Sequence, residues 1–154
     1  MSNEITSRVL EPQPTAVIRD KVPIENISEW LSAAYQEISA RLSDLGTAAV
    51  GPPFASYTVH DKVFEVEAGF PVAAEIPAQE RVEPSMLSGG TAAVTTYYGP
   101  YDAIASAYQA LDEWLVKNGY RDNGMRWEVY YTDPVREPDP AHWRTDVVAP
   151  YREW

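Results

Sequence analysis

The chain has 154 residues, of which 45% are hydrophobic, so it is long enough for one domain with a buried core. Its 23 acidic and 12 basic side chains give a net charge of -11, which disfavours nucleic acid and anionic membrane surfaces as partners. The absence of cysteine excludes disulfides, thiolate nucleophiles and cysteine-ligated zinc. The N-terminus has no secretion signal and no apolar run approaches about 18 residues, so we expect a cytoplasmic protein.

The first half of the chain is predicted to contain one helix flanked by strands. Thr15–Arg19 reads TAVIR, an extended segment. From Ile24 to Leu45 apolar residues recur every three or four positions, as on an amphipathic helix, and Gly46 is the expected stop. The segments GPPFASYTV, beginning at Gly51, and FEVEAGFPV, beginning at Phe64, are expected strands.

The second half repeats this order. Thr91–Tyr98 is an expected strand, and apolar spacing predicts a helix over Asp102–Asn118, with Asp102 as N-cap and Gly119 as terminator. The expected strands after it are GMRWEVYYT, beginning at Gly124, and WRTDVVAPY, beginning at Trp143. The intervening residues 133–143 carry prolines and both charge signs, as an exposed connection would.

A constant offset of 73 residues, from Gly46 to Gly119, relates the two halves. The aligned pairs include Ala34 and Ala107, Tyr35 and Tyr108, Phe54 and Trp127, and Tyr57 and Tyr130. We therefore predict one α+β domain over residues 1–154, made of two β-α-β-β repeats at about 5–75 and 80–154 and joined by the linker Pro77–Gly90. The repeats are expected to share one antiparallel sheet, with both helices on one face and a ligand groove on the other.

Three segments together resemble one known family. They are YYGPYDAIASAYQALDEWL, RWEVYYTDP and RTDVVAPY, and in the first half RVLEPQPTAVIR and EAGFPV fit as well. Their order and spacing resemble the gyrase-inhibitor-like (GyrI-like) family, which is also the effector-binding domain of bacterial multidrug-responsive transcription activators. The resemblance implies a duplicated unit, a groove for amphipathic and often cationic drugs, and a key acidic residue that maps to Glu128.

The chain departs from the family in two respects. In the activators this domain is fused to a DNA-binding helical module, whereas here the repeat begins within the first 15 residues, so we expect no direct nucleic-acid partner. At Tyr98, before the Gly-Pro-Tyr turn, many relatives carry a histidine. A role of that histidine does not transfer to this chain.

Strand alternation separates Trp127 from Glu128. Because Trp127 aligns with Phe54, we expect it to pack under the helices and Glu128 to point into the groove on the opposite face. A carboxylate among aromatic rings is a plausible receptor for an organic cation. The expected ligand-binding residues are Glu128, Tyr57, Tyr97, Tyr98, Tyr101, Tyr130 and Trp143. Tyr35 and Tyr108 lie on the apolar helix stripes and are assigned to the core.

Three functions follow as hypotheses. The first is a stand-alone small-molecule-binding domain that senses or sequesters amphipathic drugs or metabolites, which we expect to be cationic. It acts alone, as a homodimer, or docked to a separate regulator that links it to transcription regulation. The second is a detoxifying hydrolase of strained electrophiles, in which Glu128 is the catalytic residue and the hydroxyl of Tyr97 or Tyr98 assists the departing group. The third is an acidic protein inhibitor of a DNA enzyme such as gyrase. We expect no cofactor, and with His60 and His142 as the only histidines we expect no metal site.

Overall fold

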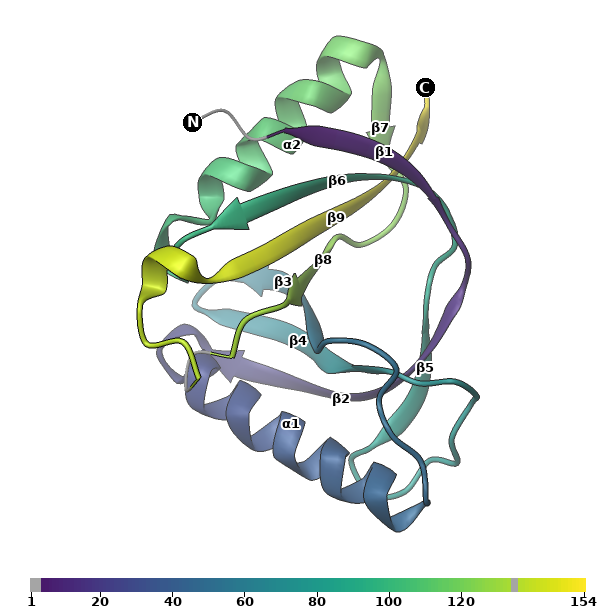
Figure 1. Cartoon of the computed structure of the whole chain (residues 1–154). Coiled ribbons are helices and arrows are strands. Elements are labelled where there is room, and N and C mark those ends of the chain that lie inside the picture. The colour runs from purple at the N-terminus through teal and green to yellow at the C-terminus, as the bar shows by residue number, and fades with distance from the viewer. Residues whose placement is uncertain (1–3, 134–135) are drawn as a thin grey trace. The chain divides into compact units, whose positions relative to one another are not determined.

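The computed structural model describes residues 4–133 and 136–154, which divide into two compact units. One unit is Pro12–Leu87, and the other joins Ser88–Trp154 to the N-terminal residues up to Glu11. Each unit contains one long α-helix and antiparallel strands, so the predicted α+β class is confirmed (Figure 1). In the described residues no helix is both long enough and apolar enough to cross a membrane.

The unit Pro12–Leu87 is a four-stranded antiparallel sheet with one helix packed on it. Its elements are β2 (Gln13–Pro23), a short 3-10 turn η1 (Ile24–Asn26), α1 (Ile27–Asp44), β3 (Phe54–His60), β4 (Val63–Pro71) and β5 (Glu83–Leu87). β4 pairs with both β2 and β3, and β5 pairs with the other edge of β2. The sequence placed β5 in a linker, but its five residues form a strand.

The second unit has the same plan. Its elements are β1 (Ile5–Leu10), β6 (Gly90–Tyr98), the 3-10 turn η2 (Tyr101–Ala103), α2 (Ala105–Asn118), β7 (Tyr120–Asp122), β8 (Trp127–Tyr130), the 3-10 turn η3 (Pro140–His142) and β9 (Arg144–Glu153). β9 pairs with both β6 and β8, β1 pairs with the other edge of β6, and β7 pairs with the end of β9. The predicted exposed connection holds η3, and its residues 134 and 135 lie outside the described residues.

The strand pairing confirms the predicted duplication. The order β2-β4-β3 in one unit corresponds to β6-β9-β8 in the other. Registers agree as well, because Phe54 pairs with Gly69 as its counterpart Trp127 pairs with Val148. The edge strands differ from a simple repeat. β1 comes before the first repeat in the chain but pairs with β6 of the second, and β5 comes before the second repeat but pairs with β2 of the first.

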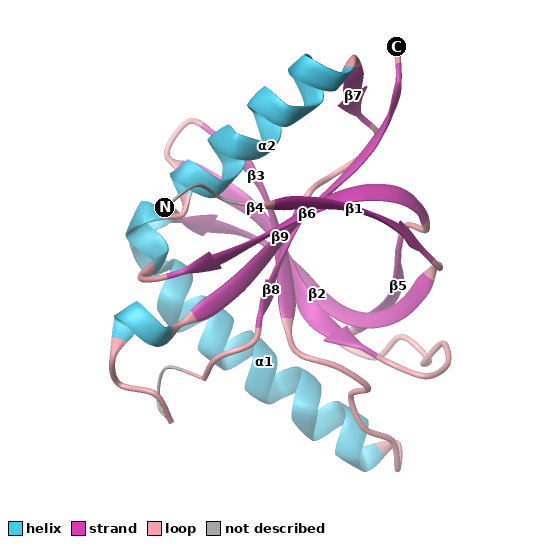
Figure 2. Cartoon of the chain, turned by 45° about the horizontal axis from the view of Figure 1, so that its top comes forward, coloured by secondary structure: helices cyan, strands magenta, loops and turns pink. Residues whose placement is uncertain are grey.

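The two long helices are the cyan coils α1 and α2 in Figure 2. Each buries one stripe of side chains against the strands of its own unit. The core of the first unit gathers around α1 and includes Ala16, Ile18, Ala34, Ile38 and Leu42. The core of the second gathers around α2 and includes Ala93, Tyr97, Ala107, Leu111, Leu115, Val147 and Ala149. The apolar spacing in the sequence identified both stripes correctly.

The helix ends only partly follow the sequence signals. Gly119 caps α2 in the left-handed conformation with φ 76°, as predicted, because glycine adopts this geometry without steric cost. Asp102 is not an N-cap, since it lies inside η2 and α2 begins at Ala105 without a side-chain cap. The N–H of Ile104, which could have donated to a capping carboxylate of Asp102, donates instead to the Tyr101 carbonyl at 3.3 Å within the 3-10 turn.

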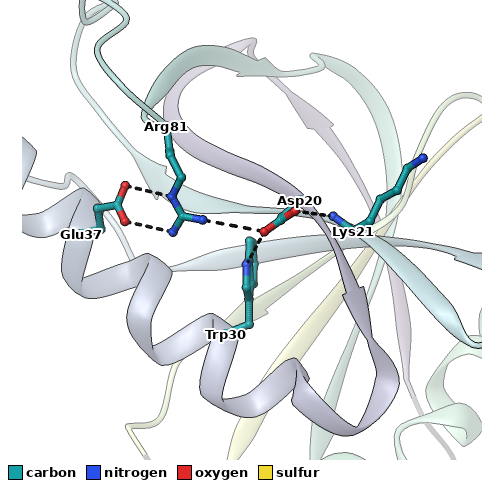
Figure 3. A network of polar contacts seen from close by, with 5 residues as sticks. All are labelled: Asp20, Lys21, Trp30, Glu37 and Arg81. Carbon is teal, nitrogen blue, oxygen red and sulfur yellow. Dashed lines mark hydrogen bonds and ion pairs between the residues drawn. The ribbon is translucent and has the colours of Figure 1, made fainter.

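A surface network fastens α1 and the segment before β5 to β2 (Figure 3). Arg81 donates to Glu37 on α1 at 2.9 Å and lies 3.7 Å from the carboxylate of Asp20 on β2. The same carboxylate accepts a 3.1 Å hydrogen bond from the indole of Trp30. Because these groups are exposed to solvent, each ion pair contributes less than about 1 kcal/mol to stability.

Candidate functional site

Glu128 is the buried acid of β8, with 8% of its surface exposed. Its cross-strand partner on β9 is Val147, and directly paired residues of an antiparallel sheet share a face. Val147 belongs to the core cluster around α2, so Glu128 faces α2 and Trp127 lies on the opposite face. The predicted orientation of this strand was therefore wrong.

Two tyrosine hydroxyls hold the Glu128 carboxylate. Tyr108 on α2 donates a hydrogen bond of 2.5 Å to Oε2, and Tyr130 on β8 donates one of 2.9 Å to Oε1. Each carboxylate oxygen thus has one phenol donor, from a different element. A carboxylate held from two sides presents its remaining lone pairs in a fixed direction.

Burial raises the pKa of Glu128 above its ordinary 4.5, although the hydrogen bonds from Tyr108 and Tyr130 oppose this shift. Among the residues that the structure describes, no lysine, arginine or histidine forms an ion pair with it. A buried anion that has hydrogen-bond donors but no countercharge is an incomplete electrostatic arrangement. It would be completed by a cation.

A row of three aromatic rings begins at Tyr130. The ring of Tyr101, in η2, lies 5.6 Å from that of Tyr130 and 5.1 Å from that of Trp143. The indole N–H of Trp143 donates to the Glu137 carbonyl at 2.7 Å, which fixes its ring. Burial and the nearby acids Glu128 and Asp133 raise the pKa of Tyr101, so its hydroxyl stays protonated and neutral.

Of the predicted ligand-binding residues, the structure brings together Glu128, Tyr101, Tyr130 and Trp143. Tyr97 lies on the same sheet face, but its ring belongs to the core around α2 and its hydroxyl donates to the Pro100 carbonyl at 2.8 Å. Burial raises the pKa of Tyr97, with a smaller contribution from Asp102. Tyr97 therefore acts as a core residue with a satisfied hydroxyl.

The other two predicted residues do not join this cluster. Tyr98 pairs with Arg144, the neighbour of Thr145, so it lies on the face opposite Glu128, where 63% of its surface is exposed. Tyr57 belongs to the unit Pro12–Leu87, and its ring lies 5.7 Å from that of Phe64. A ligand contact by Tyr57, and a groove formed by both repeats, stay predictions.

Sequence reasoning missed Tyr108 as a partner of Glu128 in the candidate site. Its position on the apolar stripe of α2 assigned it to the core, and its ring does pack against that cluster. Its hydroxyl, however, binds Glu128. The repeat contained a signal, because the offset that aligns Tyr35 with Tyr108 also aligns Ala55 with Glu128. Tyr35 donates to the Phe54 carbonyl at 2.8 Å.

The second repeat is therefore the one that carries a charge at this position. Ala55 is fully buried in β3, and its counterpart Glu128 occupies the equivalent register in β8. In 4–133 and 136–154, no three His, Asp or Glu side chains are grouped to hold a metal ion. The chemistry of the site rests on one carboxylate, phenol hydroxyls and aromatic faces.

The sequence of residues 3–152 matches the model of the GyrI-like small molecule binding domain. No curated protein matches the chain at a significant level. The matched range covers both units and includes Glu128 with its neighbours Tyr101, Tyr108, Tyr130 and Trp143.

Solved structures share the fold. EcmrR in a cryo-EM complex with DNA has a TM-score of 0.87 and 20% identity, and the match covers 100% of this chain and 59% of EcmrR. The crystal structure of the EcmrR C-terminal domain has a TM-score of 0.83 at 18% identity, with 100% of both chains covered. This chain thus spans little more than half of the EcmrR chain in the DNA complex.

Two further structures are more distant. A crystal structure of a hydrolase from Listeria innocua has a TM-score of 0.67 and 12% identity, covering 98% of this chain and 93% of the hydrolase. SAV2435 bound to tetraphenylphosphonium has a TM-score of 0.59 and 10% identity, covering 99% of this chain and 94% of SAV2435. At identities this low, the structural similarity establishes a common fold and does not by itself establish a common function.

Proposed function

Because the chain belongs to the GyrI-like small-molecule-binding family, we propose that it binds an amphipathic organic cation, with Glu128 as the charge partner. The observation that carries the proposal is the buried carboxylate of Glu128, which has two phenol donors and no ion pair among the described residues. A bound cation supplies the missing charge. The rings of Tyr101, Tyr130 and Trp143 supply apolar contact beside it.

The energetic logic favours a ligand that is both cationic and apolar. Each good cation-π contact contributes about 0.5–2 kcal/mol, and burial of apolar ligand surface contributes about 25 cal/mol per Å². A small hydrated cation gains the charge term but loses its hydration shell. An apolar cation has less hydration to lose and gains area against the rings.

Related proteins support this ligand class and a regulatory context. SAV2435 has been solved with tetraphenylphosphonium, a lipophilic cation, and EcmrR has been solved on DNA. We propose that this domain senses or sequesters such a ligand and, in the sensing role, passes the signal to a separate regulator or to a second copy of itself. The chain's net charge of -11 makes direct contact with DNA unfavourable.

The test is isothermal titration of wild type and Glu128→Gln with tetraphenylphosphonium and with neutral triphenylphosphine oxide. Glutamine keeps the size of the side chain and removes its charge. Its amide NH₂ replaces one of the two acceptor oxygens, so one of the phenols of Tyr108 and Tyr130 has to accept a hydrogen bond in place of donating it. We expect the variant to lose about 1–3 kcal/mol of affinity for the cation and little for the neutral ligand. Equal cation affinity in both proteins would show that Glu128 is not the receptor.

A hydrolytic function is the second candidate. The raised pKa of Glu128 and its contact with two phenols suit a group that activates or orients water, and the fold is shared with a Listeria innocua hydrolase. The discriminating measurement is product analysis with a strained electrophile such as an aryl epoxide. Turnover that disappears in Glu128→Gln while binding persists would favour the hydrolase over the binding module.

A further inference from the structure

A second polar group is buried beside Glu128 on the same sheet face. Thr145 of β9 is fully buried, and its hydroxyl Oγ1 has no hydrogen-bond partner among the described residues. Its direct cross-strand partner is Tyr130, and the next pair along this face is Glu128 with Val147. Thr145 and Glu128 are thus diagonal neighbours, a placement with backbone separations of about 7–8 Å.

The first repeat shows what this position holds when no charge is present. Thr145 corresponds in register to Val66, because Val66 pairs with Tyr57 as Thr145 pairs with Tyr130. Val66 is buried with 2% of its surface exposed, so the position accepts an isosteric apolar side chain. Relative to the first repeat, the second has therefore gained three buried polar groups on one face, the carboxylate of Glu128 and the hydroxyls of Thr145 and Thr95. Thr95 stands where the first repeat has Ile18, and its hydroxyl donates to the Glu4 carbonyl at 3.0 Å, so of the two hydroxyls it is that of Thr145 that has no partner among the described residues.

An unpaired buried hydroxyl is unfavourable for folding, whereas the valine of the first repeat fits without that penalty. The comparison with Val66 shows that the fold does not need a hydroxyl at the position of Thr145. The neighbouring hydroxyls do not satisfy Oγ1, since Tyr97 donates to Pro100 and Tyr130 donates to Glu128. A partner for Oγ1 therefore has to come from outside the chain, as a buried water or as a group on a ligand.

We propose that Thr145 is a specificity residue that accepts a hydrogen bond from the ammonium N–H of the ligand, while Glu128 balances its charge. This inference rests on the proposed function and narrows it to protonated amines over fully alkylated or arylated cations. The N–H reaches a buried hydroxyl, so a side chain that now packs over the face has to move when the ligand enters. Tyr101 is suited to this because it lies in the three-residue turn η2, outside the strands.

The experiment compares two probes that differ by one methyl group. They are the (biphenylmethyl)dimethylammonium ion, which has an N–H, and the (biphenylmethyl)trimethylammonium ion, which has none. Both are titrated calorimetrically into wild type, Thr145→Val, Thr145→Ser and Glu128→Gln. We expect wild type to bind the N–H probe about tenfold more tightly than its methylated analogue, the difference that one hydrogen bond to a charged group provides.

In Thr145→Val that preference is expected to fall to less than about twofold, and Thr145→Ser is expected to restore it because serine keeps the hydroxyl. Loss of affinity for both probes in Glu128→Gln, with the preference unchanged in Thr145→Val, would overturn the role of Thr145 while leaving the proposed function standing. Failure of wild type to bind either probe, or unchanged binding in Glu128→Gln, would overturn the proposed function itself.

Discussion

The hydroxyl of Tyr108 on α2 donates a 2.5 Å hydrogen bond to Oε2 of Glu128 on β8. This contact joins the helix to the sheet through the buried charge of the second unit. The first unit makes the corresponding helix-to-strand contact without a charge, from the hydroxyl of Tyr35 to the backbone carbonyl of Phe54. The same substitution can therefore be made at Tyr108 and at Tyr35, and the two effects can be compared within one protein.

Tyr108→Phe is expected to reduce the free energy of unfolding at neutral pH by about 1.5–3 kcal/mol, because a buried carboxylate loses a donor while the ring is kept. Tyr35→Phe is the matched control and is expected to cost about 0.5–1.5 kcal/mol, as for a hydrogen bond between neutral groups. Urea denaturation of both variants measures the difference. A smaller loss in Tyr108→Phe than in Tyr35→Phe would contradict the assignment of a charged acceptor.

The raised pKa of Glu128 predicts how stability depends on pH. The folded protein holds the carboxyl proton more tightly than the unfolded chain, whose carboxyl has the ordinary pKa of 4.5. Wild type should therefore lose stability relative to Glu128→Gln as pH rises from 4.5 through the folded pKa, and the difference should be constant below this window. Urea titrations of both proteins at a series of pH values measure it.

The comparison with Glu128→Gln isolates this carboxyl because every other titrating group is shared. The unfolding free energy of Glu128→Gln minus that of wild type should rise with pH through this window and then level off. A difference that stays flat across the acidic range would mean that Glu128 titrates normally in the folded protein. Its hydrogen bonds from Tyr108 and Tyr130 would then outweigh the effect of burial.

Apolar spacing and the repeat predicted the two helices and the strand, helix, strand, strand order along each half, and the family resemblance pointed to Glu128 as the candidate acid. They assigned the wrong face to Glu128, because alternation separates neighbours without saying which of them faces the helix. That choice depends on the register with β9, a pairing over nearly 20 residues of intervening chain that no local pattern encodes. The hydroxyl of Tyr108 was missed for a related reason, since a tyrosine on an apolar stripe buries its ring and can still use its hydroxyl.

Tyr98 and Tyr130 provide a test of the corrected face. Tyr130→Ala should weaken cationic and neutral ligands alike, by about tenfold or more, because it removes a ring that contacts Tyr101 and a donor to Glu128. Tyr98→Ala should change either affinity by less than about twofold, since this exposed residue lies on the opposite face. Titration calorimetry of both variants checks this. A large loss of ligand affinity in Tyr98→Ala alone would indicate that the ligand binds on the face opposite Glu128.

The chain is expected to bind ordinary duplex DNA weakly or not at all at physiological salt. Its net charge of -11 opposes the phosphate contacts that supply most non-specific affinity. A gel-shift titration with a mixed-sequence duplex is the measurement. Submicromolar binding by this chain would contradict the expectation and would favour a direct role in transcription over ligand sensing alone.

Cation affinity should rise with pH, because the cation pairs with the ionised form of Glu128 and the proton has to leave first. Tetraphenylphosphonium is the suitable probe since its own charge does not change with pH. Below the raised pKa of Glu128 its affinity for wild type should fall by up to tenfold per pH unit, and above that pKa it should be constant.

Glu128→Gln supplies the control for this titration, since it should bind the cation weakly and with little dependence on pH. Neutral triphenylphosphine oxide should show no rise with pH in wild type, because it gains nothing from the ionised carboxylate. If the affinity of wild type for tetraphenylphosphonium is the same from about pH 4 to pH 8, the carboxylate is not the group that receives the cation. The aromatic cluster of Tyr101, Tyr130 and Trp143 would then have to account for binding through its rings alone.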